Sequence, residues 1–542
     1  MVEMLDFKRS AYVSVSLDHQ RNKGRRSARM EKKAPDRQPN LLIIIVDNQW
    51  AGTLGCYGNA EHRTPHLDKL ARQGMRFSNG YCTNGLCSPT RASVLTGLMP
   101  SQHGVHEPFN DNLSYLPEEW TAVREFRTLP LTLRNRGYNT ALVGKWHLGQ
   151  CAKPAVGFEH WVAFPRGHTT DFYNTRVLDN GKEYEVKDRH AVEFWAEKAS
   201  EYLDDYDDEK PFFLYVGFNG PYTMSPTAFG PDHQNPFYKD YEDFDFKPLQ
   251  EHIHEKLLAF ITKPYDPNAS PELDSADPLG MLEALNAEVF DYVRMHNDPS
   301  SRANIAAQNA MVDHGVGVIM EALERNKLEE NTLVLYLSDH GLPYGQHGWW
   351  TAGLGFPQVM YDQNVNIPLI MRHTGAIDAN RVPDLMVSEV DIFPTILDYL
   401  GFGDVEIADS PGRSFAPLLR GEPLAGWEQE VYFEHEETRG IRTPQYSYWK
   451  RLEAMEAENE LYDLVNDPDM YENVYGKPGY KKIAAELDKK VVSFFEKYSN
   501  PRYDLWKGGR PKLITYRPFK WPQLWGKDWA VDTELNPEFS EE

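Results

Sequence analysis

The sequence predicts an α/β protein in which a mixed central sheet is flanked by helices and followed by a smaller C-terminal α+β domain. Unbroken apolar runs at 41–46, 212–218 and 332–337 are typical of parallel strands that are buried on both faces. Helix-like stretches separate these runs, as expected where strands alternate with crossover helices. After residue 425 the pattern changes to short antiparallel strands.

Composition shifts indicate where the parts of the chain begin and end. Residues 1–38 are polar and basic, so we expect a mobile N-terminal tail. Residues 39–424 would form the large, catalytic domain, with an insertion at 225–300 that is rich in Pro, Asp and aromatic residues. We expect the small α+β domain at 425–498 and an extension at 499–542 that wraps the surface or a neighbouring subunit.

The other elements follow from apolar spacing and from residues that begin or end helices. Residues 303–328 predict a long amphipathic helix with its apolar side chains broadly on one face. The remaining expected helices lie at 64–70, 129–136 and 480–498, and the remaining expected strands at 366–371, 430–433, 440–443, 446–451 and 460–464.

Composition and charge exclude some classes of partner. The net charge of −24 argues against nonspecific binding to nucleic acid or to an anionic membrane, since both require basic surfaces. No apolar run has the length of a signal peptide or a membrane span, so we expect a cytoplasmic protein. With 4 Cys in 542 residues, no disulfide framework is indicated.

The stretch around Cys87 predicts a turn followed by the start of a helix. Ser88 is a good helix cap, and Pro89 suits the first helical position. A thiol at this point lies where unpaired N–H groups favour negative charge, and Arg91 adds a fixed cation. The residues therefore predict a nucleophile beside an anion-binding turn; the alternative is a buried structural Cys.

Ligand-type side chains follow two of the predicted strands. Asp47 and Asn48 come directly after 41–46, and Asp339 and His340 come after 332–337. In open α/β sheets, ligands gather at the carboxyl ends of the strands. Hard oxygen donors with one imidazole suit Ca²⁺, with Mn²⁺ or Mg²⁺ as alternatives. The alternative reading is solvated carboxylates at strand ends.

A third strand end carries basic side chains. Residues 137–149 predict a short strand that ends in Lys145 and His147, whose alternation places both on one face. A surface pair is the alternative. Tyr222 follows the predicted strand at 212–218, so we expect it at the same edge of the sheet.

The stretch Cys87-Ser88-Pro89-Thr90-Arg91, followed by Leu95-Thr96-Gly97, resembles the sulfatase signature. The stretch around Lys145 and His147 resembles the second signature of the same family. The chain is therefore identified as similar to formylglycine-dependent type I sulfatases of the alkaline-phosphatase-like superfamily, over roughly residues 40–475. The resemblance implies that a maturation enzyme oxidises Cys87 to 3-oxoalanine (formylglycine), whose hydrated aldehyde is the nucleophile.

The resemblance also implies roles for the other residues. Arg91 and Lys145 would hold the nucleophile and the sulfate, and His147 would be the base that releases sulfate. The metal ligands it implies are Asp47, Asn48, Cys87, Asp339 and His340.

This chain departs from the family pattern at three places. Asn48 stands where most relatives have a second Asp, and Tyr222 stands where most have a His. The usual Lys after the Asp339-His340 pair is missing as far as Arg372. We therefore expect His347 to donate the proton to the leaving group and Tyr222 to position the ester.

The predicted activity is hydrolysis of a small sulfated sugar, aryl sulfate or alkyl sulfate to an alcohol and inorganic sulfate. One alternative is a phosphonate monoester or phosphodiester hydrolase of the same superfamily. A second alternative is an inactive protein that binds sulfated ligands. The sequence leaves a homo-oligomer open.

Overall fold

The computed structural model describes residues 37–109, 113–165, 167, 172–187, 189–207, 209–222, 231–247, 298–349, 358–455, 457–518 and 520–540. Most of the tail predicted at 1–38 and most of the insertion predicted at 225–300 lie outside the described residues.

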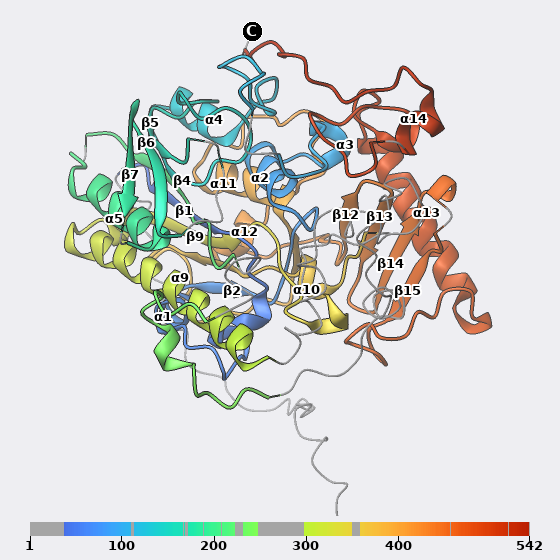
Figure 1. Cartoon of the computed structure of the whole chain (residues 1–542), viewed down its shortest axis with the longest axis horizontal. Coiled ribbons are helices and arrows are strands. Elements are labelled where there is room, and N and C mark those ends of the chain that lie inside the picture. The colour runs from blue at the N-terminus through green and yellow to red at the C-terminus, as the bar shows by residue number, and fades with distance from the viewer. Residues whose placement is uncertain are drawn as a thin grey trace, which may run out of the picture. The chain divides into compact units, whose positions relative to one another are not determined.

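A nine-stranded mixed sheet forms the centre of the described chain (Figure 1). Strands β9, β1, β8, β4 and β5 run parallel, whereas β2, β10, β6 and β7 are added at the edges through antiparallel pairs. The order of the strands is β2 (Met75–Phe77), β10 (Leu369–Arg372), β9 (Thr332–Ser338), β1 (Asn40–Val46), β8 (Phe212–Gly217), β4 (Asn139–Gly144), β5 (His160–Ala163), β6 (Asn174–Asp179) and β7 (Lys182–Lys187).

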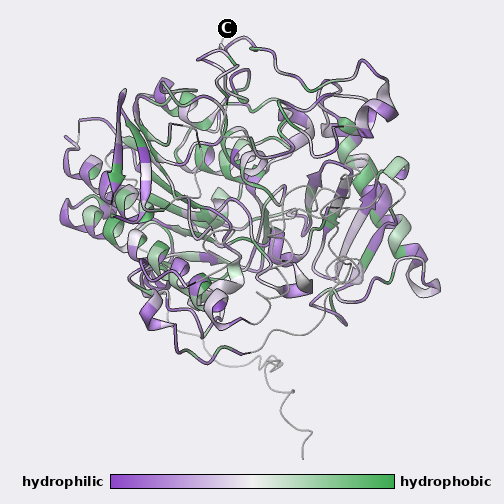
Figure 2. Cartoon of the chain, in the orientation of Figure 1, coloured by the Kyte–Doolittle hydropathy of each residue, from purple (hydrophilic) through white to green (hydrophobic). Residues whose placement is uncertain are grey.

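Both faces of this sheet are covered, which explains the unbroken apolar runs. Every residue of β1, β8 and β9 is buried. Along β1, Leu41, Ile43 and Ile45 enter one core and Leu42 and Ile44 enter the other, as the strand alternation requires. Figure 2 shows the hydrophobic residues concentrated in these central strands.

Helices on the two faces supply the partners of these side chains. One core receives apolar residues from α2 (Cys87–Thr96), α4 (Leu129–Asn135) and α11 (Ile392–Tyr399). The other receives them from α1 (Pro65–Gln73), α5 (Ala191–Asp204) and α9 (Pro299–Arg325). Helix α9 begins four residues before the predicted start, because Asp298 accepts hydrogen bonds from the N–H groups of Ser300 and Ser301.

The chain contains further short elements that the sequence did not predict. Strand β3 (Asn79–Tyr81) pairs with β11 (Met386–Ser388) in a separate two-stranded sheet. Short α-helices among the described residues include α3 (Pro100–His103), α10 (Asp362–Val365) and α12 (Ala416–Leu419). Described 3-10 helices lie at Ala51–Thr53, Gly55–Tyr57, Tyr238–Asp240, Glu329–Asn331, Gln346–Gly348, Glu389–Asp391, Glu453–Met455, Pro478–Tyr480 and Leu505–Lys507.

The C-terminal α+β part contains a four-stranded antiparallel sheet with α13 (Lys481–Tyr498) packed against it. Its strands are β12 (Val431–His435), β13 (Thr438–Arg442), β14 (Tyr446–Arg451) and β15 (Glu460–Asp463). Residues after 498, which include α14 (Lys520–Trp525), bury Tyr503, Leu505 and Trp521 completely. This last stretch is therefore part of the packed protein.

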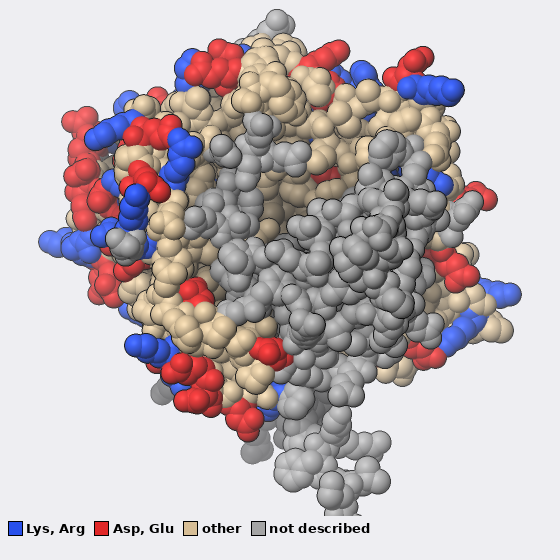
Figure 3. Space-filling view, viewed as in Figure 1, with Lys and Arg blue, Asp and Glu red and all other residues tan. Residues whose placement is uncertain are grey.

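Charge is mixed on the described part of the surface that Figure 3 shows. Lys and Arg side chains alternate with Asp and Glu side chains along its edge. Among the described residues, no helix has both the length and the apolar character needed to cross a membrane.

Candidate active site

Two parallel strands bring acidic side chains together at one edge of the sheet. In the β1–β9 pair, Val46 lies opposite Ser338, so the next residues along the chain, Asp47 and Asp339, emerge side by side. The N–H of Asp339 donates to the carbonyl of Val46 at 3.0 Å, which continues the ladder past the strand ends. The predicted meeting of these strand ends is therefore seen in the structure.

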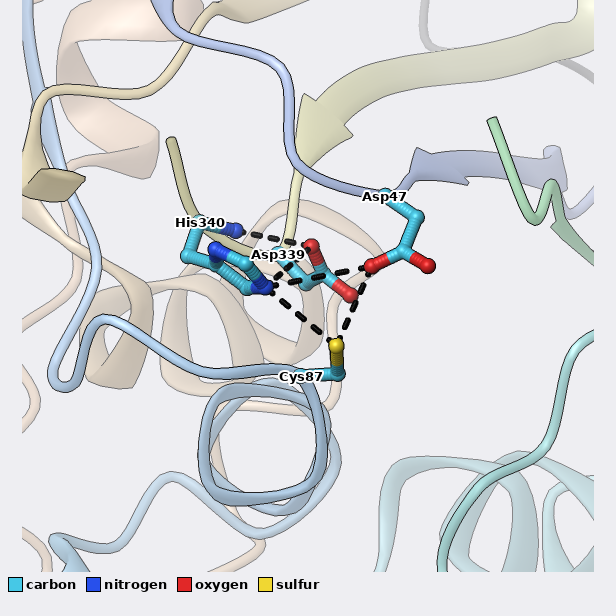
Figure 4. A group of neighbouring side chains, drawn as sticks. All are labelled: Asp47, Cys87, Asp339 and His340. Carbon is cyan, nitrogen blue, oxygen red and sulfur yellow. Dashed lines mark hydrogen bonds and ion pairs between the residues drawn. The ribbon is translucent and has the colours of Figure 1, made fainter. Parts of the chain in front are cut away.

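A cluster of four buried ligand-type side chains forms at this edge (Figure 4). One donor atom from each of Asp47, Cys87, Asp339 and His340 lies within 4.8 Å of the others. Cys87 Sγ lies 3.2 Å from Asp47 Oδ1 and 3.3 Å from His340 Nε2. The Nδ1 of His340 lies 2.8 Å from the carbonyl of Gly341, so Nδ1 donates and the Nε2 lone pair faces the cluster.

Asn48, which follows Asp47 directly, has a left-handed backbone beside this cluster. Its φ is 69°, and its N–H donates to Asp339 Oδ1 at 3.3 Å. The side chain is fully buried, and among the described residues neither its Oδ1 nor its Nδ2 has a hydrogen-bond partner. An unsatisfied buried amide is costly unless something binds it. Two carboxylates, an imidazole and an amide oxygen fit a divalent cation.

Two buried cations balance the two carboxylates. Arg91 donates from Nε to Asp339 Oδ2 at 2.9 Å, and Lys145 donates from Nζ to Asp47 Oδ2 at 2.6 Å. Burial alone would raise the pKa of Asp339, but Arg91, His340 and Lys145 outweigh it and hold the pKa at about 2. At Asp47 burial prevails over Lys145, and the pKa is raised. These pairs place positive charge beside Cys87.

Lys145 is positioned by a close approach of two glycines. Gly144 has a φ of +105°, and a Cβ there would lie 2.0 Å from the carbonyl oxygen of Gly217. Strand β4 ends at Gly144. Lys145 extends the pairing with β8 by one more hydrogen bond, which its N–H donates to the carbonyl of Gly217 at 2.7 Å. The prediction of a strand through His147 was wrong, because His147 has a left-handed φ of 57°.

The loop that carries His147 is held by a hydrogen bond to the loop at Phe109. Its Nε2 lies 2.9 Å from the carbonyl of Phe109, so Nε2 donates and Nδ1 keeps the lone pair. Burial and the charge of Lys145 lower the pKa of His147 well below its usual value. The imidazole is therefore neutral near pH 7, in the form that accepts a proton.

Ser88 does not cap the helix, contrary to the prediction. Helix α2 begins at Cys87, with Leu86 at the N-cap and no side-chain cap. Ser88 Oγ instead donates to the carbonyl of His147 at 2.7 Å and accepts from the N–H of Phe109 at 3.2 Å. The tertiary partners have replaced the local cap, so Ser88 joins the two loops beside Cys87.

The two expected leaving-group residues lie in different surroundings. The Nζ of Lys145 lies 5.9 Å from the centre of the Tyr222 ring, so Tyr222 lies beside this buried cation. His347 is buried, and its ring stacks on that of Tyr361, with the ring centres 3.7 Å apart. The centre of the Tyr471 ring lies 4.9 Å from that of His347. The role of His347 as proton donor stays a prediction.

Known proteins resemble the chain along most of its length. Residues 39–402 match the family model described as Sulfatase, and residues 345–497 match the model described as N-sulphoglucosamine sulphohydrolase, C-terminal. An N-acetylglucosamine-6-O-sulfatase of Bacteroides thetaiotaomicron is 29% identical over 532 residues, covering 88% of this chain and 91% of that protein. The N-sulphoglucosamine sulphohydrolase of Homo sapiens is 30% identical over 402 residues, covering 72% and 67%.

Solved structures share the fold. A protein in complex with its substrate D-glucosamine-2-N,6-O-disulfate has a TM-score of 0.65 and 24% identity, covering 85% of this chain and 98% of that chain. The phosphonate monoester hydrolase of Agrobacterium radiobacter has a TM-score of 0.63 and 21% identity, covering 85% and 96%. At such identities the likeness concerns the fold alone. The family model, however, spans more than half of the 542 residues, and the chain belongs to the sulfatase family.

Proposed function

We propose that this protein hydrolyses sulfate esters of sugars to an alcohol and inorganic sulfate, with formylglycine made from Cys87 as the nucleophile. The main support for this proposal is the buried cluster of Asp47, Cys87, Asp339 and His340. Arg91 and Lys145 form ion pairs with its two carboxylates. A sugar is proposed because the relatives are named for sulfated glucosamine derivatives. The maturation enzyme would be a partner of the newly made chain.

The chemistry at Cys87 supports a modified residue. Burial and the charge of Asp47 raise the pKa of the Cys87 thiol well above its usual value. A thiol that stays protonated is a weak nucleophile. The side chain nevertheless lies at the start of α2, within electrostatic range of Lys145 and Arg91. This position suits the formylglycine that the sulfatase family uses.

The divalent ion would be held by modified Cys87 and by four further side chains: Asp47, Asn48, Asp339 and His340. Their mostly oxygen donors favour Ca²⁺, with Mn²⁺ or Mg²⁺ as alternatives. A bound divalent ion polarises a sulfate oxygen and lowers the pKa of a neighbouring hydroxyl.

The chain's own side chains would divide the remaining work. Arg91 and Lys145 are fixed cations that stabilise the charge on the sulfate oxygens as the ester bond breaks. Neutral His147 accepts a proton when sulfate is released. Tyr222 positions the ester, and His347 donates a proton to the departing alcohol.

Mass spectrometry and a substrate panel test this proposal. Protein made with a formylglycine-generating enzyme should carry the aldehyde at position 87, and Cys87→Ala should be inactive. Fully active protein with an unmodified thiol would refute the mechanism. The kcat/KM of the matured enzyme is then compared across five substrates: N-acetylglucosamine 6-sulfate, glucosamine N-sulfate, an aryl sulfate, a phenyl phosphonate and a phosphodiester. Preference for the phosphorus esters would support the phosphonate or phosphodiester hydrolase, and binding without turnover would support the inactive binding protein.

A further inference from the structure

The residues after 498 lie beyond the matched C-terminal family model, which ends at 497, yet they are anchored in the protein. A Cβ on Gly104 would lie 2.6 Å from the ring of Tyr503, so the tyrosine packs directly on that backbone. Buried Lys512 donates from Nζ to the carbonyl of Ala122 and to Glu125 Oε1, both at 2.5 Å. The extension is therefore held by residues of the large domain.

A second anchor is the β12–β13 turn together with the last two residues of β12, at 434–437, and the side chains of these four residues are all buried. This turn contacts the segment just before the nucleophile. The N–H of Glu434 donates to the carbonyl of Thr83 at 2.8 Å, and Asn84 Nδ2 donates to the carbonyl of Glu434 at 2.8 Å. Cys87 follows Asn84 by three residues, so the turn lies beside the start of α2.

The same turn holds the extension on both sides of Tyr516. Glu436 Oε1 accepts from the N–H of Tyr516 at 2.9 Å and from the hydroxyl of Thr515. On the other side, Arg517 forms an ion pair with Glu437 at 2.9 Å. The backbone at 515–517 is thus fixed, while the Tyr516 residue itself is only partly buried.

The surroundings of the Tyr516 phenol include the nucleophile position. Burial raises the pKa of Tyr516 well above its usual value, and the charges of Glu107, Tyr222, Cys87 and Glu436 act on it in the same direction. The phenol therefore lies within electrostatic range of these side chains and stays protonated. Tyr222 is also only partly buried, so two tyrosines with accessible surface lie near Cys87.

We propose that Tyr516, supplied by the C-terminal extension, and Tyr222 form two walls of the subsite that receives the sugar ring bearing the sulfate. An accessible tyrosine offers a flat apolar face to the C–H groups of a pyranose and a hydroxyl to its polar groups. The extension then determines which sulfated sugars enter. This inference rests on the proposed function.

The test compares a ligand that contains the sugar ring with one that lacks it. Tyr516→Ala should weaken binding of N-acetylglucosamine 6-sulfate about tenfold. Tyr516→Phe keeps the ring and should lose only about threefold. The affinity for inorganic sulfate should stay unchanged in both variants. Trp525→Phe, in the same extension at a residue 37% exposed, should leave all constants at their wild-type values.

Titration into metal-loaded Cys87→Ala protein that carries each substitution gives these constants without turnover, and kcat/KM is measured on the matured enzyme. Equal weakening of the sugar sulfate and inorganic sulfate by Tyr516→Ala would overturn the inference, as would wild-type constants for both. Failure of the proposed function looks different, because the wild-type enzyme would then turn over no sulfated sugar. The binding titration still tests Tyr516 in that case.

Discussion

Replacing Asn48 by Asp should tighten divalent-metal binding and destabilise the metal-free protein. Asn48 is fully buried, and its backbone N–H lies 3.3 Å from Asp339 Oδ1. Within the described part of the chain, its side-chain amide has no hydrogen-bond partner. A carboxylate at this position would join those of Asp47 and Asp339 without a new cation to neutralise it.

Coulomb's law sets the size of both effects. At a separation of about 5 Å and an effective dielectric constant of about 20, one new charge pair contributes about 3 kcal/mol. Arg91 and Lys145 offset part of the repulsion, so the metal-free variant should lose about 1–3 kcal/mol of its free energy of unfolding. Attraction to a bound divalent ion has the opposite sign, and the Kd for Ca²⁺ should fall about 10–100-fold.

Thermal unfolding in EDTA and calorimetric titration with Ca²⁺ measure the two effects separately. Asn235→Asp is the matched control, since Asn235 is 1% exposed and its Oδ1 accepts from the N–H of Phe237. The control should be destabilised equally with and without Ca²⁺. If Asn48→Asp leaves the Kd for Ca²⁺ unchanged or raises it, the Asn48 side chain does not contact the ion.

Three further substitutions test other parts of the site. Lys145→Met removes a charge that, with burial, lowers the pKa of His147, so that pKa rises and the acid limb of the kcat/KM profile moves to higher pH. His347→Ala should slow esters with poor leaving groups about 10²-fold or more and nitrophenyl sulfate far less, because only poor leaving groups need the proton. Gly144→Ala forces a Cβ to within 2.0 Å of the Gly217 carbonyl and should cost more than about 3 kcal/mol in denaturant unfolding.

Each of these substitutions has a control. Lys145→Arg keeps the charge and should keep the acid limb near its wild-type position, whereas an unmoved limb in Lys145→Met would exclude His147 as the titrating base. Tyr222→Phe should slow good and poor leaving groups alike; the reverse pattern in the Tyr222 and His347 variants would exchange their roles. Gly137 has a φ of +88°, and a Cβ there would meet no atom within 4 Å. Gly137→Ala should therefore lower the free energy of unfolding by only about 1 kcal/mol. Equal losses at Gly137 and Gly144 would show that the contact with Gly217 is not limiting.

The sequence was a good guide to the central strands and to the residues at their carboxyl ends. Strands buried on both faces must be apolar along their whole length, so β1, β8 and β9 could be predicted from their own residues. Asp47 and Asp339 then followed, because parallel neighbours end at the same edge. By contrast, β7 is exposed or half-buried along its length and carries little apolar signal, which explains why it was missed.

Other features depend on contacts that no local pattern contains. Ser88 is of a residue type that often caps helices, but its hydroxyl donates to the carbonyl of His147, which is distant in the sequence. The left-handed backbone at His147 follows from a chain that must leave the sheet where Gly144 meets Gly217. The position of Tyr516 depends on Glu436, since a carboxylate brought there by folding holds its N–H. The apolar character that predicts burial belongs to a segment's own side chains, whereas these contacts exist only once distant segments have packed together.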